Sequence, residues 1–183
     1  SMNNSFLRFF FFFLIKKPAA GYDTWALSYD DQPNNLILRL DQEILNSFLK
    51  TVSLNNRLIA DIGCGTGRHW TTLYKLGAAS ITGFDVSAGM LEKLQLKFPG
   101  AAVILVKDHL LTGAPDQQFN FLLSTLTLAH ISNARKAMTE WNRVLQSGGE
   151  MILTDYHPEA LRRNASRTFR HQGKTYTVQS HVH

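Results

Sequence analysis

Residues 58–70 read LIADIGCGTGRHW, which combines an acid, three alternating glycines and two basic side chains. Glycine weakens helices and strands, so Gly63, Gly65 and Gly67 indicate a backbone that turns sharply or approaches a ligand closely. Asp61 lies two residues before the first glycine, where a carboxylate would repel a pyrophosphate but attract an ammonium group. The stretch therefore predicts a binding loop for a ligand that carries a positive group.

A dinucleotide-binding loop is the main alternative for these glycines. Its G-x-G-x-x-G pattern needs a third glycine at position 68, which Arg68 occupies. Asp85 ends the next apolar run, 18 residues after Gly67, where a carboxylate can accept hydrogen bonds from ribose hydroxyls. A nucleoside ligand remains favoured, and an NAD-linked oxidoreductase is the least favoured of the functions considered.

The segments that must position this loop alternate between two patterns. Helical spacing of apolar residues is seen at 37, 40, 44, 48 and 52, again after Ser87, and again before Gly148. Five apolar runs predict strands that are buried on both faces, as in a parallel sheet: 57–62, 80–86, 101–108, 119–125 and 149–155. This alternation predicts βαβ units and an open α/β sheet.

Composition narrows the class of protein. The 183 residues are 44% hydrophobic and 18% charged, which is ordinary for a single globular domain. The single Cys64 excludes an internal disulfide framework and favours a reducing, cytoplasmic setting. The histidines near the end of the chain, from His157 to His183, lack a zinc-binding spacing, so we expect no metal site.

The net charge of +5 comes from the two ends of the chain. Residues 21–156 hold 11 basic and 13 acidic residues, whereas 1–20 and 157–183 are basic. A nucleic-acid-binding surface needs its basic residues on the folded domain. We therefore expect no nucleic-acid partner.

Successive motifs of the chain resemble those of class I S-adenosylmethionine-dependent methyltransferases. They are LIADIGCGTGRHW, ITGFDVSAGML, VKDHL, FNFLLSTLTLAHI and VLQSGGEMILTDYHP, and with the entry segment YDTWALSYDD they cover roughly 22–158. The nearest subgroup is the small-molecule type related to ubiquinone and menaquinone C-methyltransferases, methyltransferase type 11. The resemblance implies a Rossmann-like, mostly parallel sheet in strand order 3-2-1-4-5 with flanking helices. It also implies S-adenosylmethionine as cofactor and S-adenosylhomocysteine as product.

The resemblance assigns cofactor contacts residue by residue. The methionine part would lie against Asp61 and the loop residues Gly63, Cys64, Gly65 and Gly67. Asp85 would bind the ribose, while Val86 and Met90 would flank the adenine. The remaining positions are Asp108 at the exocyclic amine, His109 through an adjacent backbone contact, Ser124 on the sulfonium side, Tyr29 closing over the cofactor and His69 lining the cleft.

Methyl transfer from a sulfonium needs few protein groups, because the methyl group is already a strong electrophile. The protein mainly holds a small-molecule acceptor in line with the methyl–sulfur bond, and such positioning can lower a barrier by about 7–11 kcal/mol. His130 and Tyr22 are the candidates for a base if the acceptor must lose a proton. The alternative function is a cofactor-binding but catalytically impaired remnant that acts through association.

Both ends depart from the family pattern. Ser1 and Met2 resemble an expression remnant, and Phe9–Ile15 is shorter than the ~20 residues that span a bilayer, so we expect no stable membrane insertion. We divide the chain into a Phe-rich segment, 1–20, and a domain, 21–183. The Phe-rich segment is expected to pack on its own domain or on a second copy, which would form a homodimer.

After Asp155 only 28 residues follow, where family members add a helix, a sixth strand and an antiparallel seventh. The sequence therefore predicts an incomplete sheet whose fifth strand has a bare edge. RTFRHQGKTYTVQSHVH, 167–183, predicts two short extended stretches around Gly173. We expect the basic stretch 157–174 to stay outside the packed domain.

Overall fold

The predicted parallel sheet is present in the computed structural model, which describes residues 14–183 except 33 and 164–165. Its strands run parallel in the order β4-β3-β2-β5-β6. This is the predicted order 3-2-1-4-5. From β2 the chain adds β3 and β4 toward one edge of the sheet, then crosses back and adds β5 and β6 toward the other edge, so the switch point lies between β2 and β5. The strands are β2 (Leu58–Ile62), β3 (Ser80–Asp85), β4 (Ala102–Leu105), β5 (Phe119–Thr125) and β6 (Leu145–Thr154).

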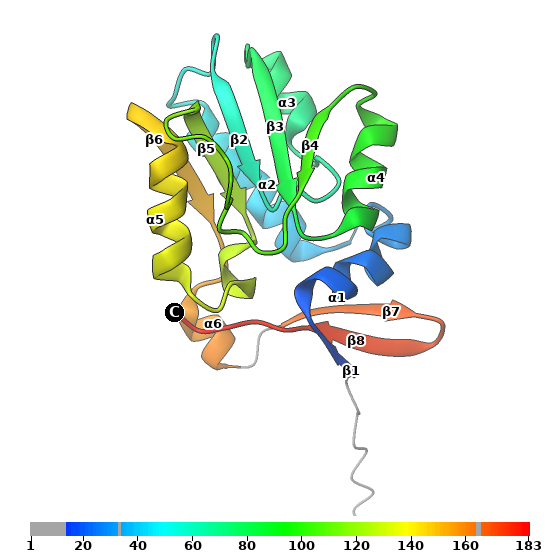
Figure 1. The fold of residues 1–183 in the computed structure, drawn as a ribbon. Helices are drawn as coiled ribbons and strands as arrows, with labels where there is room; N and C mark the ends of the chain where they lie inside the picture. The colour runs from blue at the N-terminus through cyan, green and yellow to red at the C-terminus, as the bar shows by residue number, and fades with distance from the viewer. Residues whose placement is uncertain (1–13, 33, 164–165) are drawn as a thin grey trace, which may run out of the picture.

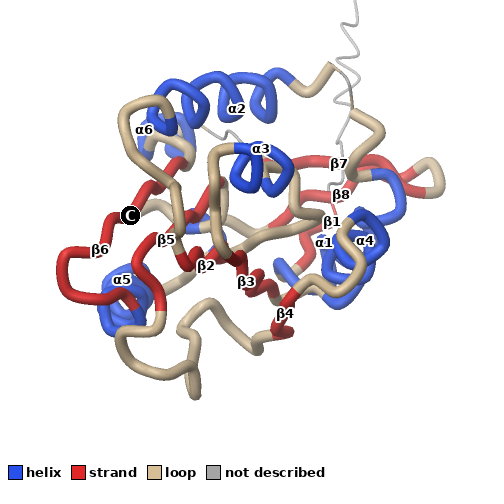
Figure 2. The backbone as a smooth tube through the Cα atoms, turned by 90° about the horizontal axis from the view of Figure 1, so that it is seen from above, coloured by secondary structure: helices blue, strands red, loops and turns tan. Residues whose placement is uncertain are grey.

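Helices cover both faces of this sheet (Figure 2). The first face carries α2 (Leu36–Leu49), α3 (Trp70–Lys75) and α4 (Ala88–Lys97), whose apolar residues share one core cluster with the strands. The opposite face is covered by α5 (Ala134–Val144), which buries Trp141 in a second cluster. Because strand side chains alternate, one strand feeds both cores: Ile59 packs on the first face and Ile62 on the second.

The predicted helix over 36–52 forms as α2, but it turns a different face to the sheet. Leu40, Ile44 and Phe48, which have the predicted apolar spacing, are about half exposed. The buried face instead carries Asp41, Leu45 and Leu49. The buried face contains an acid, Asp41, so it has fewer apolar residues than the face with Leu40, Ile44 and Phe48. Apolar spacing alone therefore predicts the wrong buried face.

The two extended stretches predicted around Gly173 form a hairpin in a second, smaller sheet. β7 (Arg167–His171) pairs antiparallel with β8 (Lys174–Val178), and β1 (Leu14–Lys16) adds to β8 in parallel. Both turn residues, Gln172 and Gly173, have positive φ (48° and 75°), as a tight two-residue hairpin turn requires.

A helical entry segment connects the two sheets. Figure 1 shows α1 (Pro18–Trp25) between the carboxyl ends of the large sheet and the hairpin. The 3-10 turn η1 (Ala26–Ser28) continues α1, while η2 (Leu128–His130) follows β5 and α6 (Pro158–Arg162) follows β6. The carboxyl ends of the parallel strands are thus covered by segments from both ends of the described chain.

The predictions for the chain ends have mixed outcomes. Most of the Phe-rich segment, residues 1–13, lies outside the described residues, and the division at residue 20 remains a prediction. Within the described ranges β6 pairs with β5 alone, as the bare-edge prediction requires. No helix in those ranges is long and apolar enough to cross a bilayer.

Candidate functional site

Two buried carboxylates lie at neighbouring strand ends. Asp61 near the end of β2 is 3% exposed, and one of its oxygens accepts a 2.7 Å hydrogen bond from the indole N–H of Trp70. Asp85 ends β3, and its two oxygens accept from the backbone N–H groups of Gly65 (2.8 Å) and Ser87 (2.9 Å). Neither acid belongs to an ion pair among the described residues.

Burial dominates the electrostatics of these acids. It raises the pKa of Asp61 to about 7, although the Trp70 hydrogen bond opposes the shift. It raises the pKa of Asp85 to about 6, against the hydrogen bonds from backbone N–H groups. The two negative charges also disfavour each other. The pair therefore forms an acidic wall without a counter-ion, which a bound cation would stabilise in its ionised form.

The glycine loop between the two acids has three left-handed residues with different surroundings. Gly63 (φ 70°) faces Thr127 so closely that a Cβ would collide with that side chain. Gly67 (φ 72°) packs on Leu94, 3.0 Å from the position of a Cβ. At Gly65 (φ 53°) a Cβ would meet nothing within 4 Å, so this backbone borders open space. Two glycines thus permit close packing, and Gly65 exposes the loop to a ligand.

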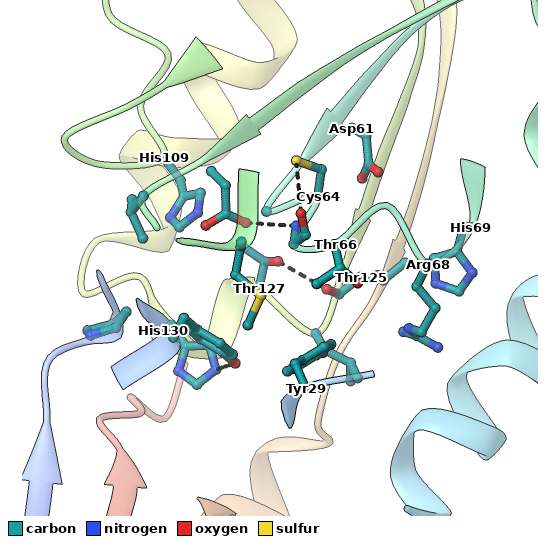
Figure 3. Close-up of a pocket in the computed structure, with 18 residues that line it drawn as sticks. Tyr29, Asp61, Cys64, Thr66, Arg68, His69, His109, Thr125, Thr127 and His130 are labelled. Carbon is teal, nitrogen blue, oxygen red and sulfur yellow. Dashed lines mark hydrogen bonds between the residues drawn. The ribbon is translucent and has the colours of Figure 1, made fainter. Parts of the chain in front are cut away.

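The loop and the acids border one cavity of about 50 Å³ (Figure 3). Larger cavities of about 300 and 400 Å³ adjoin it and share some of its lining residues. Binding sites for drug-sized ligands usually measure ~300–1,000 Å³. The central cavity is lined by Pro18, Tyr22, Tyr29, Asp61, Gly63, Cys64, Gly65, Thr66, Arg68, His69, Asp85, Val86, Met90, His109, Thr125, Leu126, Thr127 and His130.

Three residues of the predicted cofactor site do not line this cavity. Gly67 packs against α4, and the hydroxyl of Ser124 donates a 3.0 Å hydrogen bond to the carbonyl of Ile62. Asp108 lines the 300 Å³ cavity, where its carboxylate accepts a hydrogen bond from the N–H of Leu110. All other predicted site residues lie together on the central cavity, so their assignment as a site remains consistent but untested.

Several lining residues were not predicted from the sequence. The end of β5 and the loop after it contribute Thr125, Leu126 and Thr127. The others are Pro18, Thr66 and Arg68. Leu126 has a positive φ of 52°, which the sequence does not signal because leucine rarely adopts it. One signal could have identified these residues. The predicted strand 119–125 ends at Thr125, and ligands bind at the carboxyl ends of strands where the strand order reverses.

Arg68 and His69 connect the cavity to α2. Arg68 donates to a carboxylate oxygen of Asp41 at 2.5 Å, and the Nε2 atom of His69 lies 3.3 Å from the same oxygen. Thr154 at the end of β6 donates to the other oxygen of Asp41. These contacts lower the pKa of Asp41 to about 2, although its burial opposes the shift. Asp41 is buried because it holds the loop, α2 and β6 together.

The two predicted base candidates form a hydrogen-bonded pair across the chain. The Tyr22 hydroxyl lies 2.9 Å from Nε2 of His130, and Nδ1 of His130 lies 2.8 Å from the carbonyl of Gln179. A carbonyl can only accept, so Nδ1 carries the proton and Nε2 accepts from Tyr22. Burial lowers the pKa of His130 to about 4, which keeps its imidazole neutral near pH 7.

The entry segment is fixed to the glycine loop and to the start of α4 by two acids. Asp23 accepts hydrogen bonds from the Ser87 hydroxyl (2.6 Å) and the Gly89 N–H (3.0 Å) at the start of α4. Asp30 accepts from the Thr66 hydroxyl at 2.7 Å. These contacts place Tyr22 and Tyr29 over the cavity.

The expectation that the whole basic stretch 157–174 stays outside is wrong at Arg167, which is 3% exposed. Side chains alternate along β7, so Arg167 and Phe169 turn toward Trp25 while Arg170 is exposed. Arg167 donates a 3.0 Å hydrogen bond to the Tyr29 hydroxyl. The hairpin thus brings a positive charge to the aromatic side of the site.

Comparison with known proteins agrees with this geometry. A family model described as a methyltransferase domain matches residues 60–153. An uncharacterized methyltransferase of Geobacillus kaustophilus is 28% identical over 145 residues, 78% of this chain and 65% of the relative. A demethylmenaquinone methyltransferase of Tropheryma whipplei is 31% identical over 104 residues, 55% of this chain and 42% of the relative. The chain thus spans about 65% of the length of its Geobacillus relatives.

The fold also has a counterpart among solved structures. An S-adenosylmethionine-dependent methyltransferase of Mesorhizobium loti superposes with a TM-score of 0.59 at 20% identity. The match covers 74% of this chain and 64% of that one, and at this identity it supports the fold alone. Since the family model spans more than half of the chain and includes both strand-end acids, the chain belongs to the methyltransferase domain family.

Proposed function

We propose that this protein transfers a methyl group from S-adenosylmethionine to a small-molecule acceptor by direct in-line displacement. The observation that carries the proposal is the pair of buried, unneutralised acids, Asp61 and Asp85, on either side of the glycine loop. Membership in the methyltransferase domain family supports the same cofactor.

The residues present fit that cofactor in charge and in hydrogen-bonding groups. Gly65 borders open space, which lets a ligand approach its backbone. Asp61 would attract the ammonium group of the methionine part, and Asp85 has lone pairs left for ribose hydroxyls. When bound, S-adenosylmethionine supplies an electrophilic methyl group on a positively charged sulfur. Both carboxylates would be stabilised in their ionised form by this positive charge.

The opposite wall would position the acceptor. Tyr29 and His130 line the cavity on the side away from Asp61 (Figure 3), and Tyr22 lines the same cavity beside His130. If the acceptor must lose a proton, the proton would move to Nε2 of His130 once Tyr22 turns away from it. Neutral His130 is available for this role because burial keeps its pKa near 4. A base this weak suits an acceptor group that is itself acidic.

The alternative is a protein that binds the cofactor without turnover. Both functions require the entry segment to move before a cofactor can enter, because the central cavity measures about 50 Å³. The two functions differ only in turnover. The cofactor is made inside cells, so we also propose a cytoplasmic location. A homodimer joined through the Phe-rich segment stays a proposal, which light scattering with and without residues 2–17 tests.

Calorimetric titration with S-adenosylmethionine, S-adenosylhomocysteine and NAD tests the function. We expect both adenosyl ligands to bind at one site per chain and NAD not to bind. Binding of NAD alone would overturn the proposal. Tight binding without methyl transfer to any acceptor in a panel of small phenols and acids would instead favour the non-catalytic alternative.

A further inference from the structure

Arg167 is a buried cation with unused hydrogen-bond donors. Its side chain is 3% exposed, and one guanidinium nitrogen donates to the Tyr29 hydroxyl at 3.0 Å. The other two nitrogens, Nε and Nη1, are fully buried and have no hydrogen-bond partner among the described residues. Buried donors without partners typically cost ~1–3 kcal/mol each, and more when charged. The fold therefore maintains an unfavourable arrangement at this position.

No carboxylate among the described residues contacts Arg167, although its charge acts on Asp155 and favours the ionised form of that acid. Arg167 belongs to no ion pair among the described residues, and the remaining residues, 1–13, 33 and 164–165, include no Asp or Glu. The guanidinium instead lies over the rings of Trp25 (5.2 Å) and Tyr29 (5.9 Å). Cation–π contacts stabilise a charge without using its N–H donors along the plane of the guanidinium.

Arg167 does not itself line the cavity but contacts a residue that does. Tyr29 lines the cavity, and its hydroxyl accepts the hydrogen bond from Arg167. Tyr22 also lines the cavity, and the charges of both Arg167 and Asp85 act on its hydroxyl. A movement of Tyr29 would enlarge the cavity and also free Nη2, the third guanidinium nitrogen of Arg167.

We propose that Arg167 binds a carboxylate on the methyl acceptor, so that the acceptor is a small organic acid. The inference rests on the proposed function and names the substrate class of the same site. A guanidinium matches a carboxylate in geometry and charge, and such hydrogen bonds are stronger than neutral ones. The acidic wall would hold the cationic cofactor while Arg167 holds the anionic end of the acceptor.

Benzoate and benzamide form a matched pair of probes, because they differ in the charge of one small group. We expect the protein saturated with S-adenosylhomocysteine to bind benzoate at least tenfold more tightly than benzamide. Arg167→Gln should abolish this preference. Arg170→Gln removes the same charge from an exposed position in the same strand and should leave the preference unchanged.

A wild-type measurement keeps the test independent of how the variant folds. Benzoate should shift the NMR resonance of one buried arginine Nε–H, which Arg167→Lys removes, and benzamide should not. Equal affinity for the two probes in the wild type, or a preference that survives Arg167→Gln, would overturn the proposal. Binding of S-adenosylhomocysteine is measured separately in each protein: its absence would sink the proposed function, while loss of the benzoate preference alone would sink only the acid site.

Discussion

The two walls of the cavity are built in different ways. The acidic wall comes from one continuous stretch, residues 61–87, in which two strand ends and the glycine loop fix each other through backbone hydrogen bonds. The aromatic wall combines Tyr22, Tyr29, His130 and Arg167, which lie up to 145 positions apart and meet only through side chains. A wall made from neighbours in sequence can be read from a motif, whereas a wall made from distant elements cannot.

The walls also carry opposite, unneutralised charges. Asp61 and Asp85 have no basic partner, and Arg167 has no acidic one. By contrast, Asp41 beside the cavity pairs with Arg68 and accepts a hydrogen bond from Thr154, and His69 lies 3.3 Å from it. A charge that connects parts of the fold is thus paired here, whereas Asp61, Asp85 and Arg167 have no oppositely charged contact among the described residues.

The largest expected effect is a loss of stability, and it should differ between two glycines of the acidic wall. Gly63→Ala should lower the free energy of unfolding by about 2–5 kcal/mol, because it adds left-handed strain to a collision with Thr127. Gly65→Ala should lower it by only about 1–2 kcal/mol, since its Cβ meets open space. Its methyl group would point toward the ligand, so S-adenosylhomocysteine should bind more weakly. Denaturant unfolding and calorimetry distinguish the two, and equal stability losses would contradict this division of roles.

Asp85→Ala tests the acidic wall as a binding surface. We expect binding of S-adenosylhomocysteine to weaken by roughly 2–4 kcal/mol, because ribose hydroxyls lose charge-assisted hydrogen bonds. Glu92→Ala on the exposed face of α4 removes the same charge and serves as control. Unchanged affinity in a folded Asp85→Ala protein would mean that Asp85 only holds the loop through Gly65.

Affinity for S-adenosylmethionine should rise with pH. The free protein keeps protons on Asp85 below about pH 6 and on Asp61 below about pH 7. A cation favours the ionised carboxylates, so binding releases those protons and becomes about a hundredfold tighter between pH 5.5 and 7.5 if both acids lose their protons. Calorimetry in buffers of different ionisation enthalpy measures the protons released. An affinity that is flat over this range would show that neither acid contacts the cation.

Stability of the free protein gives a less direct measure of the same acids. Their raised pKa values contribute stability that is complete below about pH 4 and lost as pH rises to 7. The lowered pKa values of His109 and His130, both about 4, act in the opposite direction between pH 4 and 6.5. The comparison should therefore use Asp61→Asn beside the wild type. Between pH 5 and 7.5 the free energy of unfolding of Asp61→Asn should fall less than that of the wild type, because the variant has no buried carboxyl at this position to ionise.

The smallest effect concerns the aromatic wall. Tyr22→Phe removes the hydrogen bond to His130 and should lower the free energy of unfolding by about 1 kcal/mol. Binding of S-adenosylhomocysteine should change little, whereas methyl transfer should slow if the pair handles a proton. Tyr74→Phe, at a half-exposed tyrosine of α3, is the matched control. A Tyr22→Phe protein with wild-type stability would show that the pair is not formed in solution.

The sequence by itself predicted the parallel sheet, the glycine loop and the two strand-end acids, because each depends on spacing between neighbours. The strand order came from the resemblance to methyltransferases. Apolar runs, Gly63 to Gly67 and acids at strand ends are local signals of a parallel sheet and its ligand edge. Tertiary structure decided which face α2 buries, since Asp41 gains partners from the loop before α3 and from β6 that no helical pattern reveals. It also decided that Arg167 is buried while Arg170 is exposed, because only the docking of the hairpin against Trp25 selects one face of that strand.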